Sequence, residues 1–268
     1  MSTPDPRTRW RPAPLVCAAL LALAAAAAAL AWRPALWSWA LAAIAADFLV
    51  LTIAVFLPRS QWLGANLTRL PPAAAARRMV SFTFDDGPDP EVTPRVLDLL
   101  DRHGAKATFF CIAEKAAAHA ELARDIVRRG HRVENHSLRH SNVFAFYGIF
   151  RLRRDVESAQ AILGGITGSR PSLFRAPMGL RSPLLDPVLA RRGLRYVSWT
   201  RRGLDGVDRN AARVLRRLAG GLAAGDILLL HDTRPTVLAV LPDLLERVAA
   251  QGLTAVTLAT ALQDGRAL

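Results

Sequence analysis

The sequence predicts an α/β fold, a distorted (β/α) barrel of about seven units that is preceded by a pair of apolar helices. Strand-like and helix-like patterns alternate from residue 79 onwards, which favours a parallel sheet, either closed as a barrel or open and doubly wound. The barrel is favoured because four polar residues each follow the end of a predicted strand, namely Asp85, His136, Arg175 and His231. Barrels gather functional side chains at this face, whereas an open sheet draws on fewer strands at its switch point.

Two long apolar segments lie near the start of the chain, at residues 15–32 and 35–58, with only an Arg-Pro pair between them. Each is close to the ~20 residues that a helix needs to cross a bilayer, so residues 1–58 are predicted to form a hairpin of two transmembrane helices. Asp47 in the second segment faces either the partner helix or an interface.

A cleaved signal peptide is the competing interpretation of the first apolar segment. Alanines in that segment offer a cleavage site, and basic residues precede it at Arg7, Arg9 and Arg11. The second apolar segment predicts membrane attachment under either interpretation.

The charge balance is strongly basic, with a formal net charge of +13 from 35 Lys+Arg against 22 Asp+Glu. The arginines are scattered and form no stripe with aromatic residues, so no nucleic-acid partner is predicted. Membrane lipid is a predicted partner, because basic residues that follow the hairpin can face anionic head groups, at positions 59, 69, 77 and 78. The two cysteines, Cys17 and Cys111, predict no disulfide framework.

Residues 59–78 carry prolines around an alanine run and are predicted to be a linker. The catalytic domain is predicted to span residues 79–262, with a tail at 263–268. Its strands are predicted from short apolar runs at 79–84, 107–112, 131–134, 172–174, 195–199, 226–230 and 254–257. Its helices are predicted from helical spacing and closing glycines, at 93–102, 114–129, 151–167, 183–192, and near 209–223 and 236–250.

Asp86, His136 and His140 form a candidate metal site of two histidines and one carboxylate, which leaves coordination positions open for water and substrate. Histidines four residues apart can reach one ion if the stretch is helical or turn-like. The spacing alone is weak evidence, but the Asp-Asp turn and a third histidine at another strand end strengthen it. The predicted cofactor is a divalent cation, zinc first, with cobalt, nickel or manganese as alternatives.

Two further residues, Asp85 and His231, have separate predicted roles in proton transfer. Asp85 is predicted to be the general base that takes a proton from metal-bound water as the water attacks a carbonyl carbon. His231 is predicted to protonate the departing nitrogen, with Asp232 as a solvent-facing neighbour. The alternative for Asp85-Asp86-Gly87-Pro88 is an ordinary acidic turn.

Two of these motifs resemble those of the polysaccharide deacetylase family, carbohydrate esterase family 4 with its NodB homology domain. They are Thr83-Phe84-Asp85-Asp86-Gly87 and His136-Ser137-Leu138-Arg139-His140. Arg175-Ala176-Pro177-Met178-Gly179 resembles the third family motif and Leu229-Leu230-His231 the fifth. The resemblance covers roughly residues 79–262 and implies a distorted (β/α) barrel. It also implies hydrolysis of an N-acetyl, or other small N-acyl, group from an amino sugar.

The resemblance implies further roles within this site. Arg175 should pair with Asp85, and the backbone N–H of Met178, after Pro177, should help to stabilise the oxyanion. Asp205 should orient His231, although the Trp that usually follows it is replaced by Gly206 and Val207. The wall of the acyl pocket then comes from other residues, for which the candidates are Leu204, Trp199 and Leu229.

Three functions are compatible with these observations. The first is a membrane-anchored, metal-dependent hydrolase of an N-acylated amino sugar in a glycan, and the second is a deacylase or deformylase of a lipid-linked amino sugar. The third is a catalytically silent carbohydrate-binding protein, which has no need for a complete set of base, metal ligands and acid.

The predicted location is the bacterial inner membrane, as a multi-pass protein. The positive-inside rule places both termini in the cytoplasm, since basic residues flank both ends of the hairpin. A cell-wall substrate would instead require an outward-facing catalytic domain, so both orientations stay open.

Overall fold

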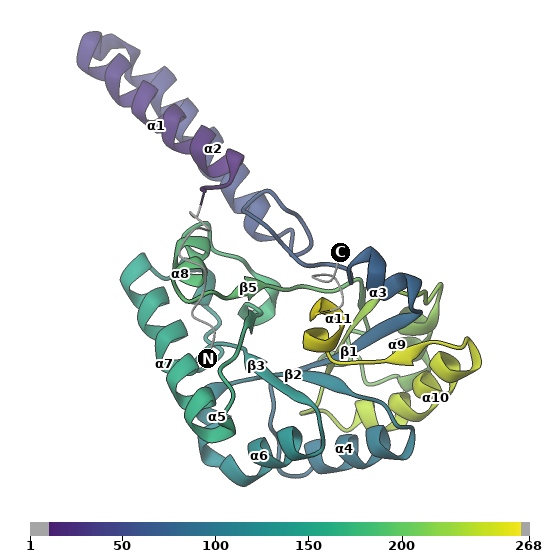
Figure 1. The fold of residues 1–268 in the computed structure, drawn as a ribbon. Helices are drawn as coiled ribbons and strands as arrows, with labels where there is room; N and C mark the ends of the chain where they lie inside the picture. Colours follow the sequence, from purple (N-terminus) through teal and green to yellow (C-terminus); the bar gives the residue numbers. More distant parts are fainter. Residues whose placement is uncertain (1–10, 264–268) are drawn as a thin grey trace.

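The computed structural model describes residues 11–263, which form a helical hairpin that projects from a barrel-like domain (Figure 1). The hairpin consists of α1 (Pro14–Trp32), a 3-10 turn (Pro34–Leu36) and α2 (Trp37–Val55). The flanking Arg7 and Arg9 and the predicted tail beyond residue 263 lie outside the described residues.

Both hairpin helices are long and apolar enough to cross a membrane. The segments Pro14–Trp32 and Pro34–Val55 have mean hydropathies of 2.4 and 2.0, and only 11% and 17% of their most apolar windows are buried. By length and composition they are candidate membrane spans, and their place near the N-terminus also fits a signal sequence.

The domain is built on a parallel sheet with the strand order β5-β4-β3-β2-β1-β7-β6, and β8 pairs with the start of β1. This curled parallel sheet with helices around it confirms the predicted α/β fold. The strands are β1 (Met79–Asp85), β2 (Ala107–Cys111), β3 (Arg132–Asn135), β4 (Leu173–Phe174), β5 (Arg195–Tyr196), β6 (Arg201–Arg202), β7 (Ile227–His231) and β8 (Thr254–Ala255).

The barrel is distorted because the segment before β1 lies between the two end strands. Leu67 forms a parallel bridge with Val197, just after β5. On the other side, the Thr200 hydroxyl, just before β6, donates to the carbonyl of Thr68 at 2.7 Å. Residues 59–78 are therefore hydrogen-bonded into the domain instead of forming a free linker.

The helices surround the sheet, and two elements differ from expectation. The helix predicted at 114–129 is broken at His119, whose φ of −125° and ψ of 52° are not helical. The strand predicted at 195–199 is shorter, and β6 follows it. The helices are α3 (Pro72–Ala76), α4 (Thr93–Arg102), α5 (Ala113–Ala118), α6 (Ala120–Arg128), α7 (Ile149–Thr167), α8 (Leu185–Arg191), α9 (Ala211–Ala219), α10 (Thr236–Ala250) and α11 (Leu258–Gln263).

Aromatic and aliphatic side chains from the central strands form the main core. Phe84 of β1 and Phe109 of β2 stack with ring centroids 5.0 Å apart, and both are fully buried. His131 packs edge-on against Phe109, and its Nδ1 accepts the backbone N–H of Ala107 at 3.1 Å. Burial lowers the pKa of His131 to about 4, so this histidine is a neutral part of the core.

Candidate active site

Strand register brings the first two functional groups together. Asp85 ends β1 and lies beside His231, which ends the neighbouring strand β7. The chain then turns at Asp86, whose φ of 74° is uncommon for a residue other than glycine. Neighbouring side chains of a straight strand point to opposite faces, so this turn allows both carboxylates to line one cavity.

Gly87 follows in the turn and lies against Asp232. A Cβ at Gly87 would lie 2.3 Å from Asp232 Oδ2, so no larger residue fits there without a shift. Asp232 is fully buried, and its Oδ2 accepts a hydrogen bond from the Thr93 hydroxyl at 2.6 Å. The expectation of a solvent-facing Asp232 is therefore wrong. Burial raises the pKa of Asp232 to about 7.

Asp86, His136 and His140 converge, and one candidate ligand atom from each lies within 4.8 Å of the others. Asp86 Oδ1 is 3.2 Å from Nε2 of His136 and 3.2 Å from Nε2 of His140. The two histidines lie in the loop after β3, where Ser137 and His140 have positive φ values of 68° and 52°. The Ser137 hydroxyl accepts the His140 N–H at 2.9 Å, so a tight turn brings the rings together.

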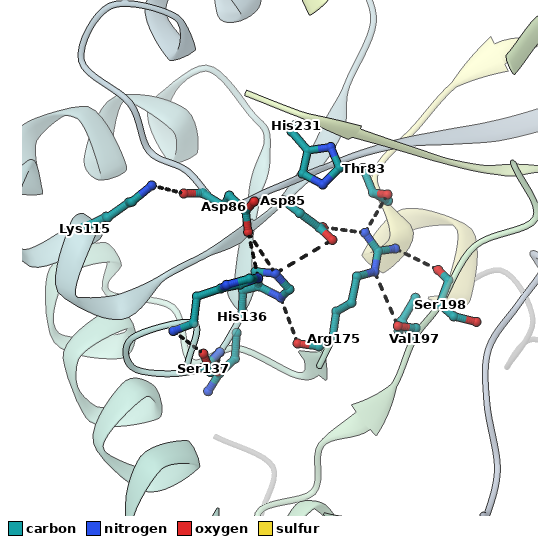
Figure 2. Close-up of polar contacts among 12 residues, drawn as sticks. Thr83, Asp85, Asp86, Lys115, His136, Ser137, Arg175, Val197, Ser198 and His231 are labelled. Carbon is teal, nitrogen blue, oxygen red and sulfur yellow. Dashed lines mark hydrogen bonds and ion pairs between the residues drawn. The ribbon is translucent and has the colours of Figure 1, made fainter. Parts of the chain in front are cut away.

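The chemistry of these three residues fits a bound cation. His136 Nδ1 lies 2.9 Å from the carbonyl oxygen of Arg175, so Nδ1 donates its hydrogen and the Nε2 lone pair faces Asp86 (Figure 2). Asp86 Oδ1 is buried and has no hydrogen-bond donor among the described residues. A buried carboxylate oxygen that faces two imidazole nitrogens without a hydrogen-bond donor suits a bound cation. Two imidazole nitrogens and one carboxylate oxygen suit zinc and other divalent transition metals.

Asp85 is fixed by a buried arginine, as expected. Arg175 Nη1 donates to Asp85 Oδ1 at 2.6 Å and to the Thr83 hydroxyl at 2.9 Å, and Nη2 donates to the carbonyl of Ser198 at 2.8 Å. Figure 2 shows Asp85 between Asp86 and the guanidinium group. Arg175 is fully buried and lies over the Phe110 ring, 4.1 Å from its centroid. This ion pair holds the Asp85 carboxylate in one orientation.

His231 is paired with Asp205, which is the partner that the sequence indicates. His231 Nδ1 lies 3.0 Å from Asp205 Oδ1, and Asp205 Oδ2 also accepts the His231 backbone N–H at 2.7 Å. Burial opposes the charged imidazolium, but the hydrogen bond and charge of Asp205, with the charges of Asp85 and Asp86, outweigh it. The pKa of His231 is therefore raised above its ordinary value.

One cavity of about 310 Å³ is lined by Asp85, Asp86, His136, His140 and His231. Trp199, Leu204 and Leu229 line it, and these are the three candidates for the acyl wall. Met178 also lines the cavity and has a φ of 56°. Pro177 is buried and is not among the lining residues.

Four cavity residues have no role in the sequence-based prediction, namely Gly179, Arg202, Gly206 and Val207. Arg202 lines the cavity, and its guanidinium lies 5.2 Å from the centroid of the Trp199 ring. Gly206 also lines it, and a Cβ there would meet the His231 ring at 3.3 Å. The glycine in place of the usual bulky residue therefore leaves the His231 ring uncovered on that side. In the sequence, Arg202 could have been proposed as a cavity residue only because it lies close to Trp199 in the chain.

Comparisons with known proteins point to one family. The family model described as polysaccharide deacetylase matches residues 73–197. A chitooligosaccharide deacetylase of Azorhizobium caulinodans is 36% identical over 160 residues, which are 58% of this chain and 74% of that protein. The chain belongs to the polysaccharide deacetylase family.

Two further proteins show how much of the chain is shared with its relatives. A peptidoglycan-N-acetylglucosamine deacetylase of Listeria monocytogenes is 32% identical over 187 residues, or 70% of this chain, and the chain spans only 39% of that relative's length. The structure of a family 4 carbohydrate esterase from Streptomyces lividans in complex with acetate superimposes with a TM-score of 0.63 at 30% identity. That match covers 66% of this chain and 91% of the esterase.

Proposed function

We propose that this chain is a metal-dependent hydrolase that removes an N-acetyl, or other small N-acyl, group from an amino sugar. The observation that carries the proposal is that Asp85, His231 and the Asp86-His136-His140 set line one cavity. Two buried residues hold the first two side chains from behind, Arg175 at Asp85 and Asp205 at His231. The relatives named as deacetylases and the acetate complex of the esterase support this substrate class.

Asp86, His136 and His140 would hold the metal, with zinc as the first candidate. A divalent metal bound there would act as a Lewis acid on the acyl carbonyl and lower the pKa of water. Asp85 would take a proton from the attacking water, because Arg175 holds its carboxylate in position and its Oδ2 lies 3.9 Å from His136 Nε2.

His231 completes the reaction from the neighbouring strand by donating a proton to the nitrogen of the amino sugar as the C–N bond breaks. Its raised pKa keeps the imidazole protonated at higher pH, which suits a general acid. The backbone N–H of Met178, at the cavity edge, donates to the oxyanion that forms on the acyl oxygen.

We further propose that α1 and α2 remain attached and cross a bacterial inner membrane. The support is the packing of the hairpin base on the domain, where Ala54 and Val55 of α2 join Leu63 and Ala145 in one buried apolar cluster. Leu15 of α1 packs against the same cluster, so both helices contribute to it. Cleavage of the first segment would remove the α1 side chains that pack against this cluster, Leu15 and Val16.

Removal of divalent metal is expected to abolish release of acetate from N-acetylglucosamine oligomers, and added zinc or cobalt should restore it. His140→Ala should lower both bound metal and turnover, because it removes one of three ligands. His103→Ala is the matched control, since His103 is exposed and outside the site. Bound metal and acetate release are measured on the same samples. Full activity after thorough chelation contradicts the proposal.

Asp205→Asn is expected to move the alkaline limb of the pH profile of kcat/KM to lower pH by about 1–2 units. The charge of Asp205 raises the pKa of His231, so its loss lowers that pKa. The general acid then loses its proton at a lower pH, and activity falls earlier as the pH rises. An unchanged alkaline limb with reduced kcat would assign Asp205 a purely structural role.

A further inference from the structure

Exposed apolar side chains of the domain are concentrated at the end of the sheet that holds the cavity, and two of them, Met178 and Val207, line it. Within residues 59–263, the large hydrophobic side chains that are exposed are Trp62, Val143, Phe146, Phe150, Met178, Leu184 and Val207. Apart from Trp62, all lie in segments that follow the carboxyl end of a strand or in the first turn of the next helix. The loops at the opposite end of the strands expose no such side chain among the described residues.

The hairpin base lies against this same face. Ala145 follows β3 and Leu180 follows β4, and both pack in the cluster that contains Ala54 and Val55 of α2. A Cβ built at Gly179 would lie 3.1 Å from Pro58, directly after the hairpin. The loops that border the cavity therefore touch the ends of the helices, and Figure 1 shows the hairpin extending away from the domain at this point.

The hairpin also has aromatic residues at both ends. Trp32, Trp37 and Trp39 are exposed at its tip, and Trp62 is half exposed and borders a surface hollow with α1 and α2 at its base. Tryptophan is enriched at the two membrane interfaces, and a 19-residue helix is about 28 Å long, close to the apolar thickness of a bilayer. This places one interface at the hairpin base, level with the loops around the cavity.

A basic groove lies beside the metal-binding loop. Its volume is about 600 Å³, and Phe150 and Tyr147 line it together with Arg139, Arg151 and Arg154. Arg154 makes no ion pair with any residue from 11 to 263. Arg139 pairs with Glu114, and Asp155 also lines the groove. Arg154 next to the exposed ring of Phe150 matches an interface that carries phosphate groups.

Resting on the proposed function, we propose that the rim of the cavity docks into the bilayer interface, and that the site acts there on an N-acyl amino sugar linked through phosphate to a membrane lipid. Val143, Phe146 and Phe150 enter the interface, and the arginine groove faces the phosphates. A substrate held at the surface then presents its sugar to the cavity without leaving the membrane.

The kinetic test uses full-length protein with metal in phosphatidylcholine vesicles. Two substrates are compared: N-acetylglucosamine linked by diphosphate to a polyprenol, and soluble N-acetylglucosamine tetramer. The variant Phe146→Ser/Phe150→Ser is expected to lose about tenfold or more in kcat/KM on the lipid-linked substrate, because two phenyl rings no longer enter the interface. It should change less than twofold on the tetramer, since neither residue lines the cavity.

Equal losses on both substrates, or on neither, overturn the proposal.

A direct measurement of depth in the bilayer tests docking separately from catalysis. A nitroxide is attached at Phe150→Cys or at His103→Cys in a Cys17→Ala background. His103 is exposed and lies between α4 and β2, at the opposite end of the strands. The label at position 150 should collide more with oxygen than with a nickel chelate, and the label at 103 the reverse. Equal exposure of the two labels rules out docking, whereas a docked rim without acetate release from either substrate counts against the proposed function alone.

Discussion

Asp85→Asn is expected to lower kcat/KM for release of acetate by about 10²–10⁴-fold, which is the usual contribution of a general base. Asn keeps the size of the side chain and can still accept the hydrogen bond from Arg175, which is 2.6 Å from Asp85 Oδ1. It cannot take a proton from water. Bound metal should stay near the wild-type amount, because the metal set is formed by Asp86, His136 and His140.

The comparison variant for Asp85→Asn is Glu91→Gln, which removes one carboxylate from an exposed position nearby and should leave turnover unchanged. Binding of a non-hydrolysed substrate analogue, measured by calorimetry, separates catalysis from recognition. A catalytically silent binding protein would show equal ligand affinity and equal lack of turnover in wild type and variant. Turnover within tenfold of wild type would remove Asp85 from the role of base.

Arg175→Met is expected to abolish activity and to lower the free energy of unfolding by about 3–5 kcal/mol. Arg175 is fully buried, and its guanidinium donates to Asp85, to Thr83 and to backbone carbonyls after β5. Met fills a similar volume but leaves the Asp85 carboxylate, which is 4% exposed, without its positive partner. An uncompensated buried charge is the main cost. Chemical denaturation in detergent, followed by circular dichroism, measures the loss.

A double-variant cycle isolates the Asp85–Arg175 pair from the other contacts of Arg175. Asp85→Asn/Arg175→Met removes both charges, so it should be more stable than Arg175→Met alone by about 1–3 kcal/mol. Strictly additive losses would show that the backbone carbonyls and Thr83, rather than Asp85, account for the stability that Arg175 contributes.

Local sequence patterns were sufficient to predict the helices and strands that depend mainly on residues close together in the chain. Helix spacing and closing glycines predict α4 and α7 closely, and apolar runs predict β1, β2 and β7. The break at His119 was not predictable in this way, because the residues on both sides suit a helix and the break depends on how α5 and α6 pack. The short strands β5 and β6 depend on neighbours that are distant in sequence.

The residue types of the candidate site can be read from the sequence, because the proposed base, acid and metal ligands each require particular side chains, and the chain displays them in the order of the family motifs. Which of these side chains meet, and which of their neighbours are buried, depends on how the chain folds in three dimensions. The burial of Asp232, the filling of the gap between β5 and β6, and the contact of the hairpin base with the cavity rim each depend on segments far apart in the chain. Such contacts form when distant apolar and polar surfaces pack together, and a local pattern does not encode that event.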